Sequence, residues 1–260
     1  MADNILSINN LTVTLRDERT TTILSDVSIS MSQGAIVGLV GGSGSGKTTI
    51  GMSMLGLLPA AMRISSGKIL FSGRDLTALS EPELRDVRGQ RIGFVFQEPM
   101  SAFDPLFTVG SQIAETIQAH ERVPAKALPS RIMRLLSTVG LPDPERAARS
   151  YPHELSGGLR QRAMIAQAIA CGPSLLIADE PTSSLDVTLQ AHIMELFRQL
   201  RKDLGLSVLL ISHDLGMVRN LADEVVILER GRVVEHGPVD RVMAAPRHEY
   251  AKKLIEAETL

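Results

Sequence analysis

The chain has 260 residues, of which 44% are hydrophobic and 22% charged, so it has enough apolar material to build a sizeable core. Its formal net charge of -2 and its aromatic content of 3%, with no Trp, argue against a broad surface that binds nucleic-acid backbone or stacks on bases. The single Cys excludes an internal disulfide and a metal site made of Cys alone.

No part of the sequence has the pattern of a targeting signal or a membrane span. The chain begins MADNILSINNLTVTL, which lacks both a basic start and a long apolar stretch, so we expect no secretory signal. No apolar run approaches the roughly 18–20 residues that cross a bilayer. We therefore expect a cytosolic or peripheral protein and not an integral one.

Strands are predicted where apolar residues alternate or run continuously. Alternation at 7–15 and 27–31 predicts half-buried antiparallel strands. Strands covered on both faces are predicted at 35–40, 91–96, 174–178, 207–211 and 224–228. Helical patterns lie between them, and this alternation favours a mainly parallel sheet with right-handed crossovers.

The first motif is a phosphate loop, residues 41–48, which spell GGSGSGKT and fit G-x-x-x-x-G-K-[ST] in full. The strand predicted at 35–40 precedes it and a helical pattern at 47–58 follows. The glycines let the backbone turn its N–H groups towards phosphate oxygens, and the helix N-terminus adds partial positive charge. A flexible Gly/Ser turn is the alternative, which the Lys-Thr pair argues against.

This loop predicts binding of a nucleoside triphosphate but does not distinguish a triphosphatase from a kinase. We assign Lys47 to the β- and γ-phosphates and the Thr48 hydroxyl to Mg²⁺. The candidate nucleotide-binding residues are Gly41, Gly42, Ser43, Gly44, Ser45, Gly46, Lys47, Thr48 and Thr49.

The section at 99–170 breaks the strand–helix alternation. It has helical patterns at 109–121, 130–139 and 159–170 and no convincing strand. The prolines that divide it are Pro124, Pro129, Pro142, Pro144 and Pro152. We interpret this section as a helical subdomain inserted in an α/β core.

A second glycine motif, Ser156-Gly157-Gly158, opens the helix predicted at 159–170. It presents backbone amides and a hydroxyl at a helix N-terminus, where anions bind well, but it has no lysine of its own. Alone it would be an ordinary turn. Here Leu155 precedes it and a basic Arg-Gln-Arg stretch follows it, so we retain it as a candidate.

The strand predicted at 174–178 ends in two carboxylates, Asp179 and Glu180. Ligands of open parallel sheets bind outside the carboxyl ends of strands, so we expect both to face the phosphate loop. Asp179 suits the Mg²⁺ shell, and Glu180 suits the base that orients or deprotonates an attacking water. Asp186, just before the helix predicted at 187–202, is either a helix cap or a functional loop residue, or both.

At this point the sequence resembles the ABC ATPase family over essentially its whole length. The phosphate loop is similar to the Walker A motif, residues 175–179 to Walker B, and 155–158 (LSGG) to the signature that only this family uses. Gln97 resembles the Q-loop glutamine, 183–186 the D-loop, and His213 the switch histidine. Six motifs in this order and spacing make chance agreement negligible.

The resemblance implies an α/β P-loop NTPase of the ABC ATPase fold, with a mainly parallel core sheet, an antiparallel β subdomain and an inserted helical subdomain. It makes 1–260 a single nucleotide-binding domain. A RecA-like core and the β subdomain would occupy 1–98 and 171–240, the helical subdomain 99–170, and a helical tail 241–260.

The resemblance also implies a mechanism. Family members are head-to-tail dimers that hold two ATP molecules between subunits, which would place Ser156, Gly157 and Gly158 on the γ-phosphate at the partner's phosphate loop. The implied catalytic residues are Glu180, His213 and Gln97, the implied Mg²⁺ ligands are Thr48, Gln97 and Asp179, and Asp186 joins the nucleotide-binding set. Loss of the γ-phosphate would open the dimer and drive transport.

One family feature is missing. Many members stack adenine on an aromatic residue upstream of Walker A, but no aromatic residue precedes Phe71 here. Either Leu15 or Arg16 replaces that contact, or the contact is absent. We therefore expect weak discrimination between ATP and GTP.

Several segments resemble the oligopeptide, dipeptide and nickel importers, namely FQEPMSAFDP at 96–105, TVGSQI at 108–113 and YPHE at 151–154. The tail PRHEY at 246–250 does so too, although Glu249 stands where proline is common. We favour peptide import and leave nickel or metal-chelate import open. With one Cys, which we expect to be a small buried residue, no iron–sulfur segment is expected.

By analogy, the partners are two membrane permease subunits contacted near 99–107, a second ATPase subunit (the same chain or another) and an extracytoplasmic solute-binding protein. The chain would then be peripheral on the cytoplasmic face of the inner membrane, with no nucleic-acid partner. The alternative of another class is an ABC ATPase acting on nucleic acid, but such proteins usually carry long coiled-coil or zinc-binding insertions between the Walker motifs, and the helical segments here are short. A P-loop kinase or GTPase conflicts with the signature, and a non-catalytic subunit conflicts with Glu180 and His213.

Overall fold

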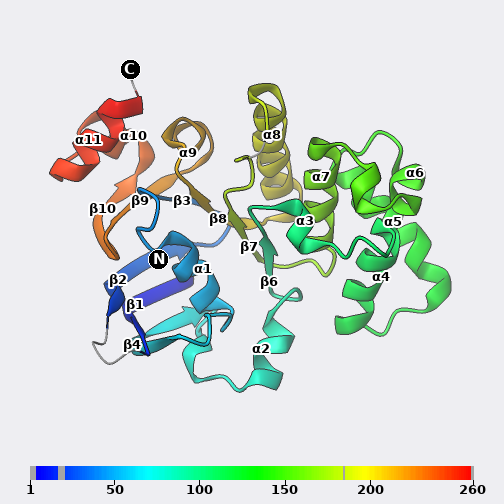
Figure 1. Cartoon of the computed structure of the whole chain (residues 1–260), viewed down its shortest axis with the longest axis horizontal. Coiled ribbons are helices and arrows are strands. Elements are labelled where there is room, and N and C mark those ends of the chain that lie inside the picture. The colour runs from blue at the N-terminus through cyan, green and yellow to red at the C-terminus, as the bar shows by residue number, and fades with distance from the viewer. Residues whose placement is uncertain (1–3, 17–20, 184, 259–260) are drawn as a thin grey trace. The chain divides into compact units, whose positions relative to one another are not determined.

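The structure is a computed structural model that describes residues 4–16, 21–183 and 185–258 (Figure 1). These residues form two compact units. The first unit comprises the described parts of Met1–Leu84 and Gly205–Leu260, and the second those of Arg85–Leu204. Both units contain strands and helices, and in both the strands end next to residues that the sequence motifs single out.

The first unit contains an antiparallel sheet in the order β2-β1-β4-β5. Its strands are β1 (Asn4–Leu15), β2 (Thr22–Ser32), β4 (Met62–Phe71) and β5 (Arg74–Asp75). Asn10, at φ 50°, lies in a register shift of β1, and an extra residue in one strand turns the following side chains to the other face. Ile8 and Leu11 are therefore both buried although three positions separate them. The predicted antiparallel pair is confirmed.

The same unit contains strands in the order β10-β9-β3-β8, with β3 parallel to both β8 and β9. They are β3 (Ile36–Val40), β8 (Ser207–Ser212), β9 (Glu224–Glu229) and β10 (Arg232–Pro238). Every residue of β3 and β8 is buried, as the continuous apolar runs predict. Helix α9 (Leu215–Leu221) lies so close that a Cβ at Gly38 would be 2.3 Å from Val218 Cγ1.

The other helical segments of the first unit are α1 (Lys47–Met54), η1 (Leu76–Ala78), α10 (Val239–Ala244) and α11 (Glu249–Glu258), and α2 (Glu81–Val87) contains the boundary between the units. The prediction that α1 reaches residue 58 is wrong. Gly56, at φ 62°, ends the helix in a turn in which the Leu57 N–H donates to the Met52 carbonyl oxygen at 2.9 Å. Glycine is favoured there because the left-handed conformation crowds a Cβ.

In the second unit, β6 (Ile92–Val95) and β7 (Leu175–Asp179) pair in parallel. The helical elements are α3 (Pro99–Ala102), α4 (Val109–His120), η2 (Ala125–Ala127), α5 (Leu128–Thr138), α6 (Pro144–Arg149), η3 (Pro152–Glu154), α7 (Gly157–Ala168) and α8 (Val187–Leu204). Helices α4 to α7 pack against one another (Figure 1). A Cβ at Gly93 would lie 2.4 Å from the Ala168 carbonyl oxygen, so the end of α7 presses on β6.

The helices predicted within 99–170 are confirmed as α4, α5 and α7, with bounds that differ by a few residues at most. Pro129 and Pro144 occupy first-turn positions of α5 and α6, where the missing N–H costs nothing. The boundaries between the two compact units differ from the predicted subdomain boundaries. The subdomain boundaries stay a prediction. Among the described residues, no helix combines the length and apolar character needed to cross a bilayer.

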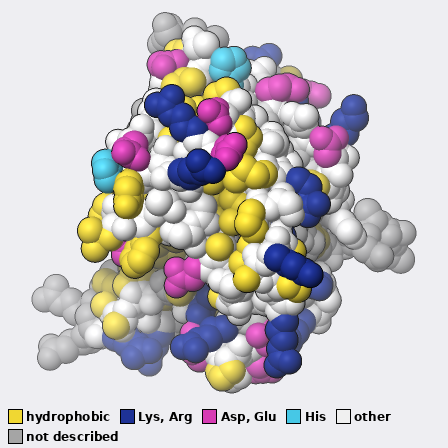
Figure 2. All heavy atoms as spheres, turned by 90° about the vertical axis from the view of Figure 1, so that its right-hand side faces the viewer, with side chains coloured by type: hydrophobic (Ala, Val, Ile, Leu, Met, Phe, Trp, Pro, Cys, Tyr) yellow, Lys and Arg dark blue, Asp and Glu magenta, His cyan; other side chains and the backbone are white. Residues whose placement is uncertain are grey.

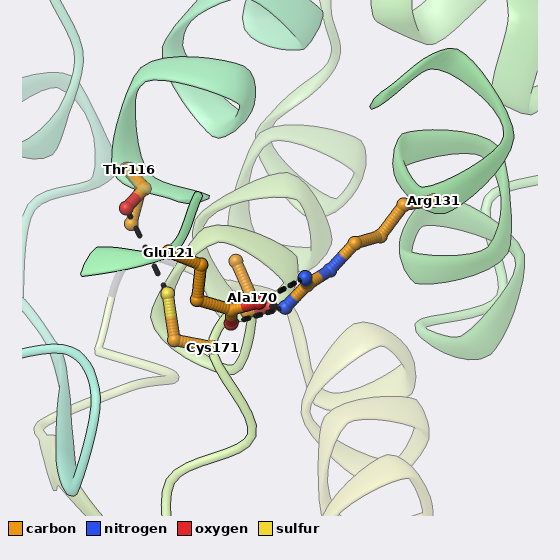
Figure 3. Close-up of polar contacts among 5 residues, drawn as sticks. All are labelled: Thr116, Glu121, Arg131, Ala170 and Cys171. Carbon is orange, nitrogen blue, oxygen red and sulfur yellow. Dashed lines mark hydrogen bonds and ion pairs between the residues drawn. The ribbon is translucent and has the colours of Figure 1, made fainter. Parts of the chain in front are cut away.

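An ion pair joins α4, α5 and the segment after α7 (Figure 3). Arg131 donates to Glu121 Oε1 at 2.6 Å and to the Ala170 carbonyl oxygen at 2.7 Å. Its hydrogen bond to Glu121 holds the pKa of that carboxyl below its usual value. The expectation that Cys171 is buried is wrong, because the residue is only half-buried, with Sγ 3.7 Å from the Thr116 carbonyl oxygen. Partial burial raises the pKa of its thiol.

Candidate nucleotide-binding and catalytic site

The phosphate loop connects β3 to α1 in the first unit. Gly46, at φ 105°, is the residue before the first turn of α1, and only glycine adopts this conformation readily. A Cβ at Gly41 would lie 2.2 Å from the Leu228 carbonyl oxygen, because β9 runs against the loop. The Gly231 N–H donates to the Ser45 carbonyl oxygen at 2.9 Å. The turn that follows β9 therefore supports the loop from outside.

Lys47 lies inside this loop. Its side chain is buried, at 6% exposed, and Nζ donates to the carbonyl oxygens of Gly41 at 2.8 Å and Gly42 at 3.2 Å. The hydroxyl oxygen of Ser45 is also buried and, in the part of the chain that the structure describes, has no hydrogen-bond partner. A desolvated ammonium and an unused hydroxyl beside backbone N–H groups form a donor set that fits phosphate oxygens.

A residue that sequence reasoning missed also contacts the loop. The hydroxyl oxygen of Tyr250, on α11, accepts a hydrogen bond from the Gly42 N–H at 2.8 Å. In the sequence, the segment PRHEY at 246–250 indicates only a resemblance to one group of importers. A contact across 208 positions of sequence leaves no local pattern that could have revealed it.

His213 follows β8 at the edge of the sheet where β3 runs into the phosphate loop. The register pairs Val40 with Ser212, so Gly41 and His213 leave neighbouring strands at the same level. The His213 side chain is exposed. Asp214, which comes next, caps α9 by accepting from the Met217 N–H at 2.8 Å. This cap fixes the course of the backbone just after His213.

In the second unit, Gln97, Asp179 and Glu180 are brought to one edge. The register pairs Val95 with Ala178, so the residues that follow β6 and β7 emerge together at the carboxyl ends of parallel strands. Asp179 is buried, at 5% exposed, whereas Gln97 is exposed. The carboxylates belong to the second unit and the loop to the first, so the predicted approach of Asp179 and Glu180 to the loop stays a prediction.

Glu180 has a φ of 48°, in the left-handed region that residues other than Gly, Asn and Asp rarely adopt. The Ser183 N–H donates to its carbonyl oxygen at 3.2 Å, which closes a turn right after β7. Strained conformations of this kind concentrate at functional sites, where the surrounding structure holds them. Asp186 caps α8 through the Leu189 N–H at 2.9 Å, as predicted, and Ser184 of the predicted D-loop lies outside the described residues.

The signature segment forms the N-terminus of α7. Ser156 is the N-cap residue, but its side chain makes no capping hydrogen bond, and Ser156 and Gly157 are exposed. Arg160 fixes the segment from behind by donating to the carbonyl oxygens of Pro152 and Leu155, each at 2.8 Å. The outer side of this helix N-terminus therefore presents N–H groups and a hydroxyl to solvent.

The family model described as "ABC transporter" matches residues 24–183, which include the phosphate loop, Gln97, the signature and both carboxylates. The chain belongs to the ABC transporter family. The resemblance drawn from the motifs is thereby confirmed. As an ABC transporter ATPase domain, it binds ATP and hydrolyses it in a reaction coupled to transport.

Similar curated proteins are named for the transport of peptides or related compounds. The chain is 46% identical over 98% of its length to the peptidoglycan transport ATP-binding protein YejF of Agrobacterium fabrum, but it spans only 47% of that protein. It is 43% identical over 98% of its length to the probable peptide ABC transporter ATP-binding protein y4tR of Sinorhizobium fredii, of which it spans 77%. It is 41% identical over 97% of its length to the dipeptide transport ATP-binding protein DppD of Bacillus subtilis, of which it spans 76%.

Solved structures confirm the predicted fold. The ATP-binding cassette MJ0796, in a dimeric post-hydrolysis state bound to ADP and Pi, is 28% identical with a TM-score of 0.80, over 90% of this chain and 98% of that one. The protein cbiO1 of Clostridium perfringens, part of the transporter complex cbiONQ, is 26% identical with a TM-score of 0.80, over 99% and 100% of the two chains. This ABC transporter ATPase therefore has the α/β fold expected from its motifs.

Leu15 and Arg16 are expected near the adenine of this ABC transporter ATPase. Leu15 ends β1, and Arg16 follows it. The Arg16 N–H donates to the Ala61 carbonyl oxygen at 2.6 Å, which fixes the backbone while its side chain is exposed. Residues 17–20 lie outside the described residues. Whether either side chain replaces the missing aromatic contact, and whether ATP and GTP bind equally, stay predictions.

Proposed function

We propose that this chain is the ATPase subunit of an importer that takes up peptides. The observation that carries the proposal is similarity along nearly the whole chain to proteins named for peptide, dipeptide and oligopeptide transport, including 45% identity to the oligopeptide transport ATP-binding protein OppD of Bacillus subtilis. The peptide-type segments at 96–113 agree with it. The GGS sequence at 41–43 supports nickel or metal-chelate import as a second candidate.

For the nucleotide we assign Gly41, Gly42, Ser43, Gly44, Ser45, Gly46, Lys47, Thr48, Thr49, Ser156, Gly157, Gly158 and Asp186. Of these, Ser156, Gly157 and Gly158 act on ATP held by a second subunit. Lys47 and the loop's N–H groups, apart from that of Gly42, which donates to Tyr250, hold the phosphates in the ground state and as charge develops. The buried ammonium of Lys47 supports this role, because hydrogen bonds to a charged donor strengthen out of water.

For hydrolysis we assign Glu180, His213 and Gln97. Glu180 takes a proton from water as the water oxygen bonds to the γ-phosphorus and the bond to the β–γ bridging oxygen breaks, which leaves ADP and phosphate. His213 holds the γ-phosphate and the water, and Gln97 responds to the presence of the γ-phosphate. The strained backbone of Glu180 supports its role.

We assign Mg²⁺ to Thr48, Gln97 and Asp179, a set of hydroxyl, amide and carboxylate oxygens of the kind that this ion prefers. Among the described residues, no group of three or more His, Cys, Asp or Glu side chains could hold a metal by itself, so the ion would arrive with the phosphates. When bound, it neutralises charge on the β- and γ-phosphates.

We assign the exposed apolar side chains at 99–107 to contact with two membrane permease subunits. Leu106 and Phe107 are 77% and 55% exposed, which is costly for large apolar groups unless a partner covers them. On the side of the molecule shown in Figure 2, hydrophobic side chains lie among charges of both signs. A second ATPase subunit, an extracytoplasmic binding protein and a position on the cytoplasmic face of the inner membrane complete the proposal.

Uptake of a labelled short peptide tests the proposal in cells that carry Glu180→Gln. The amide cannot accept the proton of the attacking water, so we expect uptake to fall to background while the protein is still made. Glu195→Gln is the matched control, because Glu195 is exposed on α8 and forms an ion pair with Arg198 on the same helix.

Two other outcomes are informative. If peptide uptake is unchanged in Glu180→Gln while nickel uptake is lost, the cargo is nickel and the peptide proposal is wrong. If Glu180→Gln hydrolyses ATP as fast as the unchanged protein, the catalytic assignment itself is wrong.

A further inference from the structure

The C-terminal helix α11 reaches the phosphate loop through one hydrogen bond. Tyr250 Oη accepts from the Gly42 N–H at 2.8 Å, and both residues belong to the first unit. A Cβ built on Gly42 would lie 3.2 Å from the same oxygen, so the hydroxyl fits closely against this part of the loop. Neither the nucleotide assignment nor the catalytic assignment uses this contact.

The contact acts on a peptide group that Lys47 also holds. The Gly42 N–H and the Gly41 carbonyl belong to the same trans peptide unit, whose N–H and C=O point in opposite directions. Tyr250 takes the N–H, and Lys47 Nζ donates to the carbonyl oxygen at 2.8 Å. Rotation of this peptide would break both bonds, so Tyr250 fixes the orientation of the carbonyl that positions the Lys47 ammonium.

The position of Tyr250 is itself fixed from β10. Glu235, whose side chain is 5% exposed, accepts at Oε2 from the N–H groups of Arg247 at 2.9 Å and His248 at 3.1 Å. These two residues immediately precede α11, and a carboxylate at a helix N-terminus is stabilised by the charge-assisted hydrogen bonds. Ala251, next to Tyr250, is fully buried. These contacts therefore fix the first turn of α11, and with it the position of the Tyr250 hydroxyl against the Gly42 N–H.

We propose that Tyr250 is a positioning residue for ATP: by holding the Gly41–Gly42 peptide, it keeps the phosphate loop and Lys47 in the arrangement that binds the nucleotide. The proposal rests on the assignment of this loop to the phosphates of ATP. The residue acts through the loop and not on the reacting atoms, so its effect belongs to binding and not to the chemical step.

Tyr250→Phe removes the acceptor and keeps the ring. We expect the Kd for ATP to rise roughly 3- to 10-fold, the effect of losing one neutral hydrogen bond, while kcat at saturating ATP changes less than about 2-fold. Tyr151→Phe is the matched control, because Tyr151 is the only other tyrosine and stacks on His153 in the second unit. It should leave the Kd unchanged. An unchanged Kd in folded Tyr250→Phe would overturn the proposal.

A double-mutant cycle separates positioning from a general loss of stability. Gly42→Ala crowds the Tyr250 hydroxyl, and Tyr250→Phe removes the atom it crowds, so we expect the two changes together to weaken ATP binding no more than Gly42→Ala alone. Effects that multiply independently would contradict the proposed contact.

Lys47→Ala distinguishes failure of this proposal from failure of the site assignment. If Lys47→Ala binds ATP normally, the loop is not the phosphate site and the proposed function falls. If Lys47→Ala loses binding but Tyr250→Phe does not, only the role of Tyr250 is wrong.

A spectroscopic measurement covers the case in which Tyr250→Phe does not fold. In the Tyr151→Phe protein, incorporation of 3-fluorotyrosine labels Tyr250 alone, because the chain has only two tyrosines. We expect its single ¹⁹F resonance to shift when ATP is added and to stay in place when ATP is added to the same protein carrying Lys47→Ala. A resonance that ATP does not move would overturn the proposal.

Discussion

The N-termini of α1 and α7 both lie at glycine motifs, since α1 follows the phosphate loop and α7 begins at Gly157, yet their surroundings differ. At α1 the loop brings its own cation, since Lys47 Nζ lies 2.8 Å from the Gly41 carbonyl oxygen, and Tyr250 and Gly231 hold the backbone from other elements. At α7 the residues that face outward, Ser156 and Gly157, are exposed and no cation belongs to the motif.

Arginines hold α7 from behind and leave its N-terminus open. Arg160 donates to two carbonyl oxygens just before the helix, and Arg162 donates to the Val139 carbonyl oxygen from its middle. Arg131, paired with Glu121, donates to the Ala170 carbonyl oxygen just after the helix ends. These guanidinium groups are used for structure, so they are not available to an anion at the N-terminus.

The difference predicts different roles for two similar helix N-termini. The loop at α1 has enough charge to hold a triphosphate by itself, because it combines backbone N–H groups with an ammonium. The signature at α7 offers only neutral donors, which bind weakly unless the anion is presented by something else. We therefore expect α1 to govern affinity and α7 to govern the rate of hydrolysis.

The largest expected effect comes from Lys47→Ala. Loss of a buried ammonium from the phosphates should raise the Kd for ATP about 100-fold or more, because charge-assisted hydrogen bonds contribute about 1.5–3 kcal/mol each. Calorimetric titration with ATP and Mg²⁺ measures it. Lys68→Ala is the control, since Lys68 is an exposed lysine of the same unit whose ion pair with Asp75 is 4.0 Å long. If Lys47→Ala and Lys68→Ala bind ATP with equal affinity, the Lys47 ammonium does not set the affinity for ATP, and α1 does not differ from α7 in the way proposed.

The next effect in size is that of Ser156→Ala. The hydroxyl makes no capping bond, so its loss should leave stability nearly unchanged. If it donates to a γ-phosphate held by a second subunit, kcat should fall roughly 10- to 100-fold while the Kd for ATP stays within about 2-fold. Steady-state hydrolysis at saturating ATP measures this split.

Ser137→Ala supplies the control for that measurement, because Ser137 is an exposed serine on α5. A Ser156→Ala protein with normal kcat would mean that the hydroxyl does not meet phosphate. A Ser156→Ala protein with normal kcat but a raised Kd for ATP would mean that α7 contributes to affinity and does not govern the rate of hydrolysis.

Much of this comparison could be predicted from the sequence, for a physical reason. Buried parallel strands need continuous apolar runs, so 35–40 and 174–178 identified β3 and β7, and a strand followed by Gly-rich residues and Lys-Thr identified the phosphate loop. The polar, half-exposed strands β4 and β10 carry no such run, and they were not predicted. The pattern of polar and apolar residues alone does not distinguish these two strands from loops.

Contacts between segments distant in the chain could not be predicted from the sequence either. Nothing near Tyr250 indicates that its hydroxyl meets Gly42, and nothing near Arg131 indicates that it fixes the end of α7. The sequence also placed Cys171 among buried residues, because free cysteines usually are, whereas it lies half-exposed beside that arginine's ion pair. Such pairings follow from the packed fold and not from local patterns.

The smallest expected effect concerns the ion pair that holds the far end of α7. Arg131 lowers the pKa of Glu121 in the folded state below its unfolded value of about 4.5, so the pair stabilises the fold above that pH. The contribution is lost as pH falls through the lowered pKa. The Glu121 side chain is 30% exposed and that of Arg131 is 23% exposed. Solvent screening therefore limits the contribution of the pair to the free energy of unfolding to about 1 kcal/mol.

Glu121→Gln tests this by urea unfolding between pH 7 and pH 4. We expect the unchanged protein to exceed the variant by about 1 kcal/mol at pH 7 and by clearly less at pH 4, because acid removes the charge that the variant already lacks. Glu145→Gln on α6, whose partner Arg149 is as exposed as itself, should show little difference at either pH. If Glu121→Gln is as stable as the unchanged protein at pH 7, the pairing of Arg131 with Glu121 does not contribute to holding the far end of α7.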